Sequence, residues 1–554
     1  MKFGESKAAM TEIDKILPVK DLCSFTVSNS DGKEFSLSEF LRLEGGSFVT
    51  FKIIFSNAQK YEKFFLHTDI KEGAWTYIPF EACPDDPQKF LLRIKVPIGG
   101  YFSCHLVALS DHIRYWEASE YHQLLFEPPT VKDFRMYTMI PSVSGDVKDW
   151  ITLLDHIKEL GFNVVHLLPF TKTGSSMSPY AAVDLFSIDQ GYADSEEDFE
   201  AFIQKASKLG IKICYDIVLN HVSSESLLVK EHANWIVPDK NRDDGLKRAG
   251  CWHMGSWISW EDLVLVNYKH TDPSIRNEIY NYMLEYVLFW TKKAERCGTV
   301  LRLDNLHSSD EDFMRWLIAE VKKSCPCTVI LSEYFGADKV LEDGVKEFGL
   351  NMLTANSWEY PFAPLFKKYL SHIHKTSGII KYFLSPTSHD TGAIPELFGD
   401  VMSTIPRFFC CALMGTGQMG IVQGFESGID HKIDFIRKPE KIELSGLNDF
   451  STFIRDINHI LDTESCFLLY KNIDFIDHPD DSLIVCVRED LEGRRFLLVA
   501  NFNTVQSVSF SYFGINSFSE ILSYGCKTYL NEKSNELKLD LSKCGVIALL
   551  INEV

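Results

Sequence analysis

Strands and helices alternate along the middle of this sequence, and this pattern limits the folds that the chain can adopt. Residues 149–160 place Trp150 and Ile157 on one helical face, and Gly161 follows where a helix would end. The next segment, residues 163–170, is almost continuously apolar, as is typical of a strand in a parallel sheet covered on both faces. A strand paired with a helix is therefore the predicted building unit of this region.

The same unit recurs further along the chain. Ser195 and Asp198 form a capping-box pattern, which predicts the start of a helix, and residues 211–219 follow as another strand. The Asp272-Pro273 pair is typical of the start of a long helix.

These repeated units predict an α/β fold, and the length of residues 131–465 suits a (β/α)₈ (TIM) barrel. One insertion, residues 222–266, separates the third strand from its helix, and we expect it to form an inserted domain B. On either side of the barrel, short apolar segments separated by turns predict strands. We therefore expect an N-terminal β-sandwich accessory domain in residues 1–130 and a C-terminal β-sandwich in residues 466–554.

The net charge restricts the class of partner. The chain has 554 residues, of which 77 are Asp or Glu and 56 are Lys or Arg, so its formal net charge is −21. Because this field repels a phosphate backbone, we expect no nucleic-acid partner. A neutral, polyhydroxylated ligand fits the charge best, although a local basic pocket would override the global sign for a phosphorylated one.

Targeting and cysteine patterns indicate a cytoplasmic protein without a cofactor or metal site. No run approaches the roughly 18 apolar residues that a membrane-spanning helix needs, so we expect no membrane partner. The first 21 residues lack the apolar core of a secretory signal. The 14 cysteines include no Cys-x-x-Cys pair, which predicts reduced thiols rather than a zinc site. The oligomeric state stays open.

A literal match to the dinucleotide-binding pattern Gly-x-Gly-x-x-Gly occurs at residues 415–420. That fingerprint requires a helix directly after the glycines, because the helix N-terminus binds the pyrophosphate. Here residues 421–425 follow, which are apolar and have the character of a short strand. We therefore reject a dinucleotide site and expect the glycines to form a tight turn before the last barrel strand.

Four polar clusters stand at the ends of four predicted strands. They are DIVLNH (216–221), RLDN (302–305), SE (332–333) and SHD (388–390). Because the C-terminal strand ends of a barrel converge at one mouth, these side chains would face one another. Taken singly, each cluster has a structural explanation, such as a helix N-cap or a surface ion pair. Together they favour a functional site, because charged groups ending apolar strands are costly unless they are paired or used.

The four clusters resemble, in order, the four signatures of the α-amylase superfamily of retaining glycosidases (glycoside hydrolase family 13). The resembling segments are DIVLNH, LRLDNLH, LSEYF and SPTSHD, with further agreements at VHLLP (165–169), SPYAAVD (178–184) and QGFE (423–426). The second signature is closest to those of glycogen-debranching glucanotransferase domains and of maltosyltransferases. The resemblance extends from about residue 135 to the C-terminus.

The resemblance implies a catalytic trio. Asp304 resembles the nucleophile, Glu333 the general acid/base and Asp390 the transition-state stabiliser. Retention of configuration needs two displacements, in which one carboxylate attacks the anomeric carbon and one carboxylic acid protonates the leaving oxygen. We expect Arg302, two residues before Asp304, to keep the nucleophile ionised.

The resemblance also implies contacts with the substrate. The substrate-binding residues that it implies are Tyr180, Asp216, His221, Arg302, His307 and His389. Among these, Tyr180 would stack on the sugar at the cleavage point, and the histidines at 221 and 389 would hold its hydroxyl groups. Asn220 resembles a position that binds calcium in some members, but no cofactor is predicted here.

This sequence departs from the family pattern at three positions. Ser388 stands where an asparagine usually precedes the His-Asp pair, and it can replace only part of the amide's hydrogen bonding. Asn305 and His307 replace the alanine and lysine that are common in secreted amylases. The resulting Asp-Asn-x-His pattern is the one that resembles debranching glucanotransferases and maltosyltransferases.

The sequence therefore predicts a retaining α-glycosidase of the α-amylase type. It would act on α-1,4-glucan or maltooligosaccharides, by hydrolysis or 4-α-glucanotransfer, through a covalent glycosyl–Asp304 intermediate. Two alternatives stay open: a maltosyltransferase that uses a sugar-phosphate donor, and a non-catalytic glucan-binding or scaffold protein on the same fold. The pattern does not distinguish hydrolysis from transfer, because both use the same trio.

Overall fold

The computed structural model of the protein describes residues 21–29, 34–37, 40–70, 74–110, 114–253 and 255–553. The chain forms two compact units. The first contains the residues up to Pro129 together with 318–327 and 346–349, and the second contains the rest of the chain. Among the described residues, no helix combines the length and the apolar character needed to cross a membrane.

The N-terminal part of the first unit is a β-sandwich. One sheet consists, in spatial order, of β2 (Glu34–Ser36), β1 (Leu22–Ser28), β4 (Phe48–Phe55), β8 (Asp86–Lys95) and β7 (Glu81–Cys83). The other consists of β3 (Phe40–Glu44), β11 (His122–Glu127), β9 (Gly100–Ser110), β5 (Lys63–Thr68) and β6 (Thr76–Pro79), with β10 (Arg114–Glu117) paired to β9. Alternate residues of both sheets, such as Phe51, Leu66 and Leu106, pack into one core.

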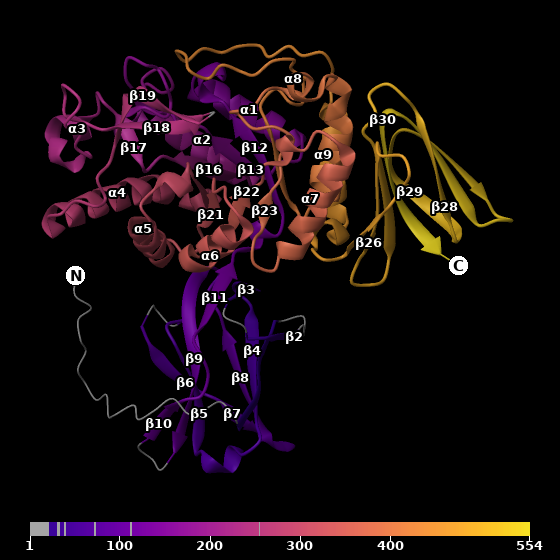
Figure 1. Cartoon of the computed structure of the whole chain (residues 1–554), viewed down its shortest axis with the longest axis horizontal. Helices are drawn as coiled ribbons and strands as arrows, with labels where there is room; N and C mark the ends of the chain where they lie inside the picture. The colour runs from indigo at the N-terminus through magenta and orange to yellow at the C-terminus, as the bar shows by residue number, and fades with distance from the viewer. Residues whose placement is uncertain are drawn as a thin grey trace. The chain divides into compact units, whose positions relative to one another are not determined.

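The second unit is built around eight parallel strands, several of which are labelled in Figure 1. In chain order they are β12 (Phe134–Met139), β13 (Val164–Leu167), β16 (Lys212–Ile217), β20 (Thr299–Leu303), β21 (Val329–Ser332), β22 (Met352–Thr354), β23 (Tyr382–Phe383) and β24 (Gln418–Val422). Leu384 connects the last strand to β23, because its amide donates to the carbonyl of Gln418 at 3.0 Å and its carbonyl accepts from Gly420 at 2.9 Å. The predicted (β/α)₈ barrel is confirmed.

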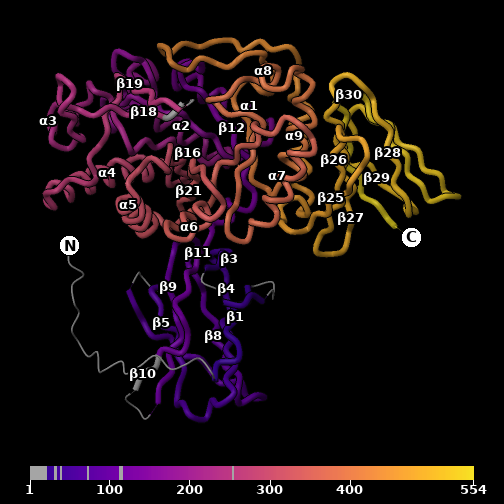
Figure 2. The backbone as a smooth tube through the Cα atoms, in the orientation of Figure 1, coloured from indigo at the N-terminus to yellow at the C-terminus, as the bar shows by residue number. Residues whose placement is uncertain are grey.

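Helices surround the barrel strands, as the tube in Figure 2 also shows. They are α1 (Val147–Glu159), α2 (Glu196–Leu209), α4 (Pro273–Lys293), α5 (Glu311–Ser324), α6 (Asp338–Phe348), α7 (Ala363–Thr376), α9 (Thr404–Leu413) and α10 (Ser451–Thr463). The predicted helix starts are confirmed: Ser195 accepts a hydrogen bond from the Asp198 amide, and Asp272 accepts one from Ser274. The short helix α8 (Ile394–Phe398) precedes α9.

The predicted turn at residues 415–420 is partly wrong, because Gly420 lies inside strand β24. A Cβ atom at Gly420 would lie 2.3 Å from the carbonyl oxygen of Met136 and 2.6 Å from the Phe383 ring, so glycine is required between the neighbouring strands. Gly417 has φ = +93° and makes the turn before the strand. A strand rather than a helix follows this turn, which agrees with the rejection of a dinucleotide site.

A small sheet lies between β16 and α4, where the sequence contains its long insertion. Its strands are β17 (His221–Ser223), β19 (Ser256–Leu265) and β18 (Arg248–His253) in spatial order, and the helix α3 (Leu227–Glu231) lies between β17 and β18 in sequence. A separate hairpin of β14 (Thr171–Thr173) and β15 (Ala182–Ile188) follows β13. Tyr180 lies between the two strands of this hairpin. Because β13 and β16 are parallel, the loops after them extend from the same end of the barrel.

The C-terminal part of the chain is an antiparallel sheet that encloses its own core. Its strands are β25 (Ile473–Ile476), β26 (Leu483–Glu489), β27 (Arg495–Asn501), β28 (Val508–Phe513), β29 (Ile515–Asn531) and β30 (Glu536–Glu553). One end of β30 pairs with β27 and the other end with β28, and the change of partner falls near Cys544, whose φ is +54°. Side chains from both ends, such as Leu539 and Leu549, share one apolar cluster.

Candidate active site

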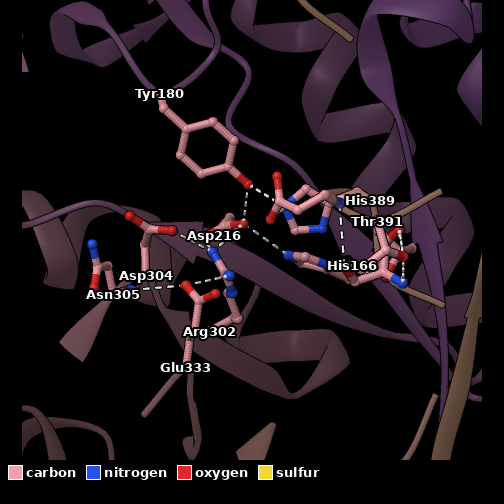
Figure 3. Close-up of polar contacts among 12 residues, drawn as sticks. His166, Tyr180, Asp216, Arg302, Asp304, Asn305, Glu333, His389 and Thr391 are labelled. Atoms are coloured by element: carbon pink, nitrogen blue, oxygen red, sulfur yellow. Dashed lines mark hydrogen bonds and ion pairs between the residues drawn. The ribbon is translucent and has the colours of Figure 1, made fainter. Parts of the chain in front are cut away.

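Arg302 lies at the centre of a cluster of acidic side chains from three neighbouring barrel strands (Figure 3). Its Nη1 donates to both carboxylate oxygens of Asp216, at 2.8 and 3.0 Å, and to Oδ1 of Asp304 at 2.6 Å. Its Nη2 donates to Oε2 of Glu333 at 2.7 Å. Asp216 belongs to β16, whereas Asp304 and Glu333 directly follow β20 and β21. The structure thus brings together the carboxylates of three predicted clusters.

The backbone after β20 also contacts Glu333. Asn305 has φ = +45° and ψ = +49°, a left-handed conformation that asparagine tolerates better than most residues. In this conformation the Asn305 amide donates to Oε2 of Glu333 at 3.0 Å. Glu333 therefore accepts both a side-chain and a backbone hydrogen bond on one oxygen, which fixes the carboxyl group next to Asp304.

Asp216 forms the buried floor of the cluster, and its side chain is fully inaccessible to solvent. Besides Arg302, its Oδ2 accepts from the hydroxyl of Tyr180 at 3.0 Å and lies 3.3 Å from Nε2 of His166. The other ring nitrogen of His166 lies 3.1 Å from the Thr138 hydroxyl. Both oxygens of this buried carboxylate thus face polar groups, as a buried charge requires.

His389 and Asp390 complete the site beside Tyr180. The hydroxyl of Tyr180 lies 2.8 Å from Nε2 of His389, and the two rings are nearly parallel, with 9° between their planes. The same nitrogen of His389 lies 3.0 Å from Oδ2 of Asp390, whose backbone carbonyl accepts from Nζ of Lys432 at 2.8 Å. The prediction that this cluster ends a strand is wrong, because residues 384–387 separate it from β23.

A cavity of about 530 Å³ opens beside these residues. Arg302, Glu333, His389 and Asp390 line it. Asp304 is not among the described residues that line it, but the guanidinium of Arg302 holds it beside Glu333. Phe335, Asn356, Trp358 and Glu359 also line the cavity. The volume and the mixture of aromatic and polar groups are typical of a small-ligand site.

The single guanidinium serves its three carboxylates unequally. Burial opposes the ionisation of Asp216, but Arg302 and His166 outweigh it and lower the pKa of that carboxyl group. Burial, together with the charges of Asp216 and Glu333, raises the pKa of Asp304 well above its usual range, and Arg302 only partly offsets this. Arg302 thus favours the ionised form of Asp304, but its one positive charge is shared among three carboxylates and does not offset the whole rise.

Asp390 lies in a different environment from the other acids, since 53% of its side chain is exposed. Partial desolvation opposes its ionisation, but His389, Arg302 and Lys432 lower the pKa of Asp390 to about 2. Asp390 is therefore an anion at any pH near neutrality, and it lines the cavity together with Glu333.

Two of the predicted substrate-binding residues lie outside this network. His221 is 4% exposed and its Nδ1 lies 2.5 Å from Oδ1 of Asn220, while burial lowers the pKa of His221 to about 4. His307 follows β20 and its ring centroid lies 6.3 Å from that of Phe335. Neither is among the described residues that line the cavity, although Phe335 is.

The surroundings of Asn220 do not fit a calcium ion. Its side-chain oxygen is engaged with His221, and calcium requires 6–8 oxygen ligands. Within the described residues, no group of three or more His, Cys, Asp or Glu side chains is placed to hold a metal ion.

Solved structures of other proteins share this fold. A maltogenic α-amylase from Thermotoga neapolitana aligns with a TM-score of 0.60 at 18% identity, covering 76% of this chain and 99% of that one. A cyclomaltodextrinase aligns with a TM-score of 0.60 at 16% identity, covering 95% of this chain and 99% of that one. At such identities the likeness concerns the fold alone.

Sequence comparison goes further. A profile of the glucanotransferase domain of glycogen debranching enzyme matches residues 130–241. The α-1,4-glucan:maltose-1-phosphate maltosyltransferase of Picrophilus torridus is 25% identical over 419 residues, which cover 69% of this chain. The chain belongs to the α-amylase superfamily. The aligned region spans 63% of the length of the Picrophilus protein, so this chain matches only part of that relative.

Several residues of the superfamily site were not predicted from the sequence. His166 was noticed only as part of VHLLP, although a histidine inside an otherwise apolar strand is a signal of a buried polar contact. Lys432 and Trp358 gave no signal, because Lys432 lies on a loop and Trp358 in a single 3-10 turn, and the position of both depends on the closed barrel. The short strands β22 and β23, of 3 and 2 residues, are below what an apolar pattern can reveal.

Proposed function

We propose that this protein is a retaining α-glycosidase that acts on α-1,4-glucans or maltooligosaccharides, by hydrolysis or by 4-α-glucanotransfer. The observation that carries the proposal is the pair of hydrogen bonds from adjacent nitrogens of Arg302 to Asp304 and Glu333. Because one guanidinium binds both groups, the two carboxyl groups are close neighbours, and retaining glycosidases need a separation of about 5–5.5 Å. Asp390 supplies a third carboxylate, which is ionised near neutral pH and lines the same cavity.

In the first half-reaction, a carboxylate oxygen of Asp304 attacks the anomeric carbon of the bound sugar. The bond from that carbon to the glycosidic oxygen breaks, its electron pair stays on the oxygen, and the oxygen takes the proton of Glu333. The result is a glycosyl ester on Asp304, an ionised Glu333 and a released chain with a new free hydroxyl group.

In the second half-reaction, water or a hydroxyl group of another glucan attacks the same carbon. Glu333 takes the proton of the attacking hydroxyl, and the ester bond breaks, so that its electron pair returns to Asp304. The two inversions give net retention. Water as acceptor gives hydrolysis, and a glucan as acceptor gives transfer.

The charges of the acidic cluster act on the nucleophile in opposite directions. Asp216 keeps its charge because its pKa is lowered, and its charge contributes to the raised pKa of Asp304. Arg302 favours the ionised form of Asp304, which the attack on the anomeric carbon requires.

Tyr180, His389 and Asp390 form the part of the site that would receive the sugar ring. The Tyr180 hydroxyl is fixed by Asp216 and His389, which orients the aromatic face. An anionic Asp390 would stabilise the positive charge that develops on the ring in the transition state. His221 is buried beside Asn220 and does not line the cavity, so we assign it a positioning role.

Transfer from a sugar-phosphate donor is the second candidate, because the Picrophilus relative is named for maltose 1-phosphate. The cavity opposes it. Arg302 is the one arginine or lysine among the described residues that line the cavity, and it is already bound to three carboxylates. A phosphate group there would instead face Glu333, Glu359 and Asp390.

Chromatography of the products from maltoheptaose tests the proposal. We expect shorter products alone for a hydrolase and a ladder that includes longer chains for a transferase, with both lost in Asp304→Ala and Glu333→Gln. Asp312→Asn, on an 84% exposed side chain, is the matched control and keeps full activity. Unchanged turnover in either site variant, or binding of maltooligosaccharides without turnover by the wild type, would overturn the proposal. Phosphate release that depends on maltose 1-phosphate would favour the second candidate.

A further inference from the structure

A row of aromatic rings crosses the outer face of one sheet of the N-terminal sandwich. His67 on β5 lies directly opposite Tyr77 on β6 and His105 on β9. The rings of His67 and Tyr77 are stacked, with centroids 4.1 Å apart and 8° between their planes, and the centroid of His105 lies 4.9 Å from that of His67. The neighbouring residues Leu66 and Leu106 point to the core, so this row is on the opposite face.

Two further rings extend the row toward solvent. The Trp75 centroid lies 4.7 Å from that of His67, the Tyr121 centroid lies 4.2 Å from that of His105, and Trp75 and Tyr121 are 6.1 Å apart. We call these five residues (His67, Trp75, Tyr77, His105 and Tyr121) the aromatic platform. Its three largest rings are half exposed, at 46% for Trp75, 47% for Tyr77 and 50% for Tyr121.

The solvent face of an antiparallel sheet is normally polar, so an aromatic platform there calls for an explanation. Folding alone does not require it, because the core of the sandwich lies on the other face. Half-exposed rings lose part of their favourable burial, and a cluster of them is typical of a binding site.

The platform is uncharged near neutral pH. Burial lowers the pKa of His67, and burial with the neighbouring histidines lowers the pKa of His105 to about 4. An uncharged surface on a protein with a net charge of −21 offers nothing to a polyanion and no counter-charge to a polycation. It suits a neutral ligand with apolar faces and polar edges, which is the character of a sugar ring.

The platform is too small to be the interface of a stable dimer. Three rings that each bury roughly 150–250 Å² when covered, and that are half exposed, offer about 300 Å² in total. A stable protein–protein interface needs roughly 800 Å² from each partner. A single ligand chain is therefore the better fit.

We propose that the aromatic platform is a second binding site for α-glucan chains, separate from the catalytic cavity. The ligand class rests on the proposed function, while the site itself rests on the rings. The planes of Trp75 and Tyr121 meet at 75°, so the platform is angled rather than flat. An α-1,4-linked chain is curved and presents successive sugar faces at an angle, whereas a flat platform would suit a straight chain. Glu117 lies near enough to Tyr121 to affect its hydroxyl and offers an acceptor for sugar hydroxyl groups at the rim.

Affinity electrophoresis in gels containing glycogen tests the site with the full chain. The variants are Trp75→Ala and Tyr121→Ala, and the control is Phe48→Ala, which removes a 48% exposed ring on the other sheet of the same sandwich. We expect the apparent dissociation constant for glycogen to rise about tenfold in each platform variant, since one stacked ring is worth about 1.5 kcal/mol, and to stay unchanged in the control. Circular dichroism verifies that all variants are folded.

Activity measurements separate this proposal from the proposed function. Platform variants should raise KM for glycogen and leave kcat/KM for maltoheptaose at the wild-type value, because a short substrate needs only the cavity. Equal retention of wild type and both platform variants would overturn the proposal. It would also be overturned if light scattering showed that the platform variants lose a dimer while their glycogen binding is unchanged. Glycogen retention that depends on Trp75 in a protein without turnover would retain the platform and reject the proposed function.

Discussion

Replacing Arg302 by methionine removes the cation that three carboxylates share. Arg302 donates four hydrogen bonds of 2.6–3.0 Å, its side chain is only 6% exposed, and that of Asp216 is fully inaccessible. Methionine fills a similar volume but leaves the carboxylates without a counter-charge. Breaking a buried ion pair by removing one partner costs about 3–5 kcal/mol, and we expect Arg302→Met to lower the free energy of unfolding by this amount at pH 8.

The loss should shrink at lower pH, and its sign follows from the pKa shifts. In the wild type the pKa of Asp216 is lowered, so this group stabilises the fold above its unfolded value near 4 and loses that effect only as pH falls through the lowered value. Without Arg302, burial raises the pKa of Asp216 instead, so stability is present at low pH and is lost as pH rises. We therefore expect Arg302→Met to approach the wild type at pH 5.

Urea unfolding followed by tryptophan fluorescence at pH 5 and pH 8 measures this difference. Arg455→Met is the control, because Arg455 forms a single, half-exposed pair with Glu159 that is worth roughly 0–1 kcal/mol. Equal losses for Arg302→Met at both pH values, or a loss no larger than that of the control, would refute the shared-cation argument.

Three further predictions concern the site and the fold. Tyr180→Phe should reduce kcat/KM about tenfold, since the lost hydroxyl bonds to Asp216 and His389 are worth about 1.5 kcal/mol; unchanged kinetics would show that these bonds do not orient the ring. Ser195→Ala should lower the free energy of unfolding by about 1 kcal/mol, because it removes the N-cap of α2. Thermal denaturation measures this loss, and an unchanged melting temperature would contradict the prediction. Because the pKa of Asp390 is about 2, its contribution to stability is complete above pH 4 and lost only below it; the melting-temperature difference between wild type and Asp390→Asn should be constant from pH 5 to pH 8, and a drift in that range would contradict the assignment.

The barrel could be predicted from the sequence because its longer strands carry their own signals. The apolar segment around β13 and the capped starts of α2 and α4 are local features, and each is where the sequence placed it. Strands β22 and β23 are too short for a pattern, and only closure of the sheet through Leu384 defines them. Local sequence therefore predicts the repeating unit, whereas ring closure depends on contacts between distant residues.

The site shows the same division. Asp304 and Glu333 stood out because each is a charged residue directly after an apolar strand, and the resemblance to the α-amylase signatures implied their roles. The sharing of Arg302 among three carboxylates was not predicted, since it depends on the side-by-side order of β16, β20 and β21. The aromatic platform was missed for a related reason: Tyr77 and Tyr121 become neighbours of the histidines only after strand pairing.

Identifying the residue that carries the glycosyl group tests the central claim most directly. The variant Glu333→Gln is incubated with α-maltosyl fluoride. Because fluoride leaves without being protonated, the missing acid does not prevent formation of the ester, and the missing base slows its breakdown. Mass spectrometry of the quenched and digested protein should then show one maltosyl group on the peptide at Asp304. Fluoride release with no adduct and a product of inverted configuration, or an adduct on another residue, would contradict the account.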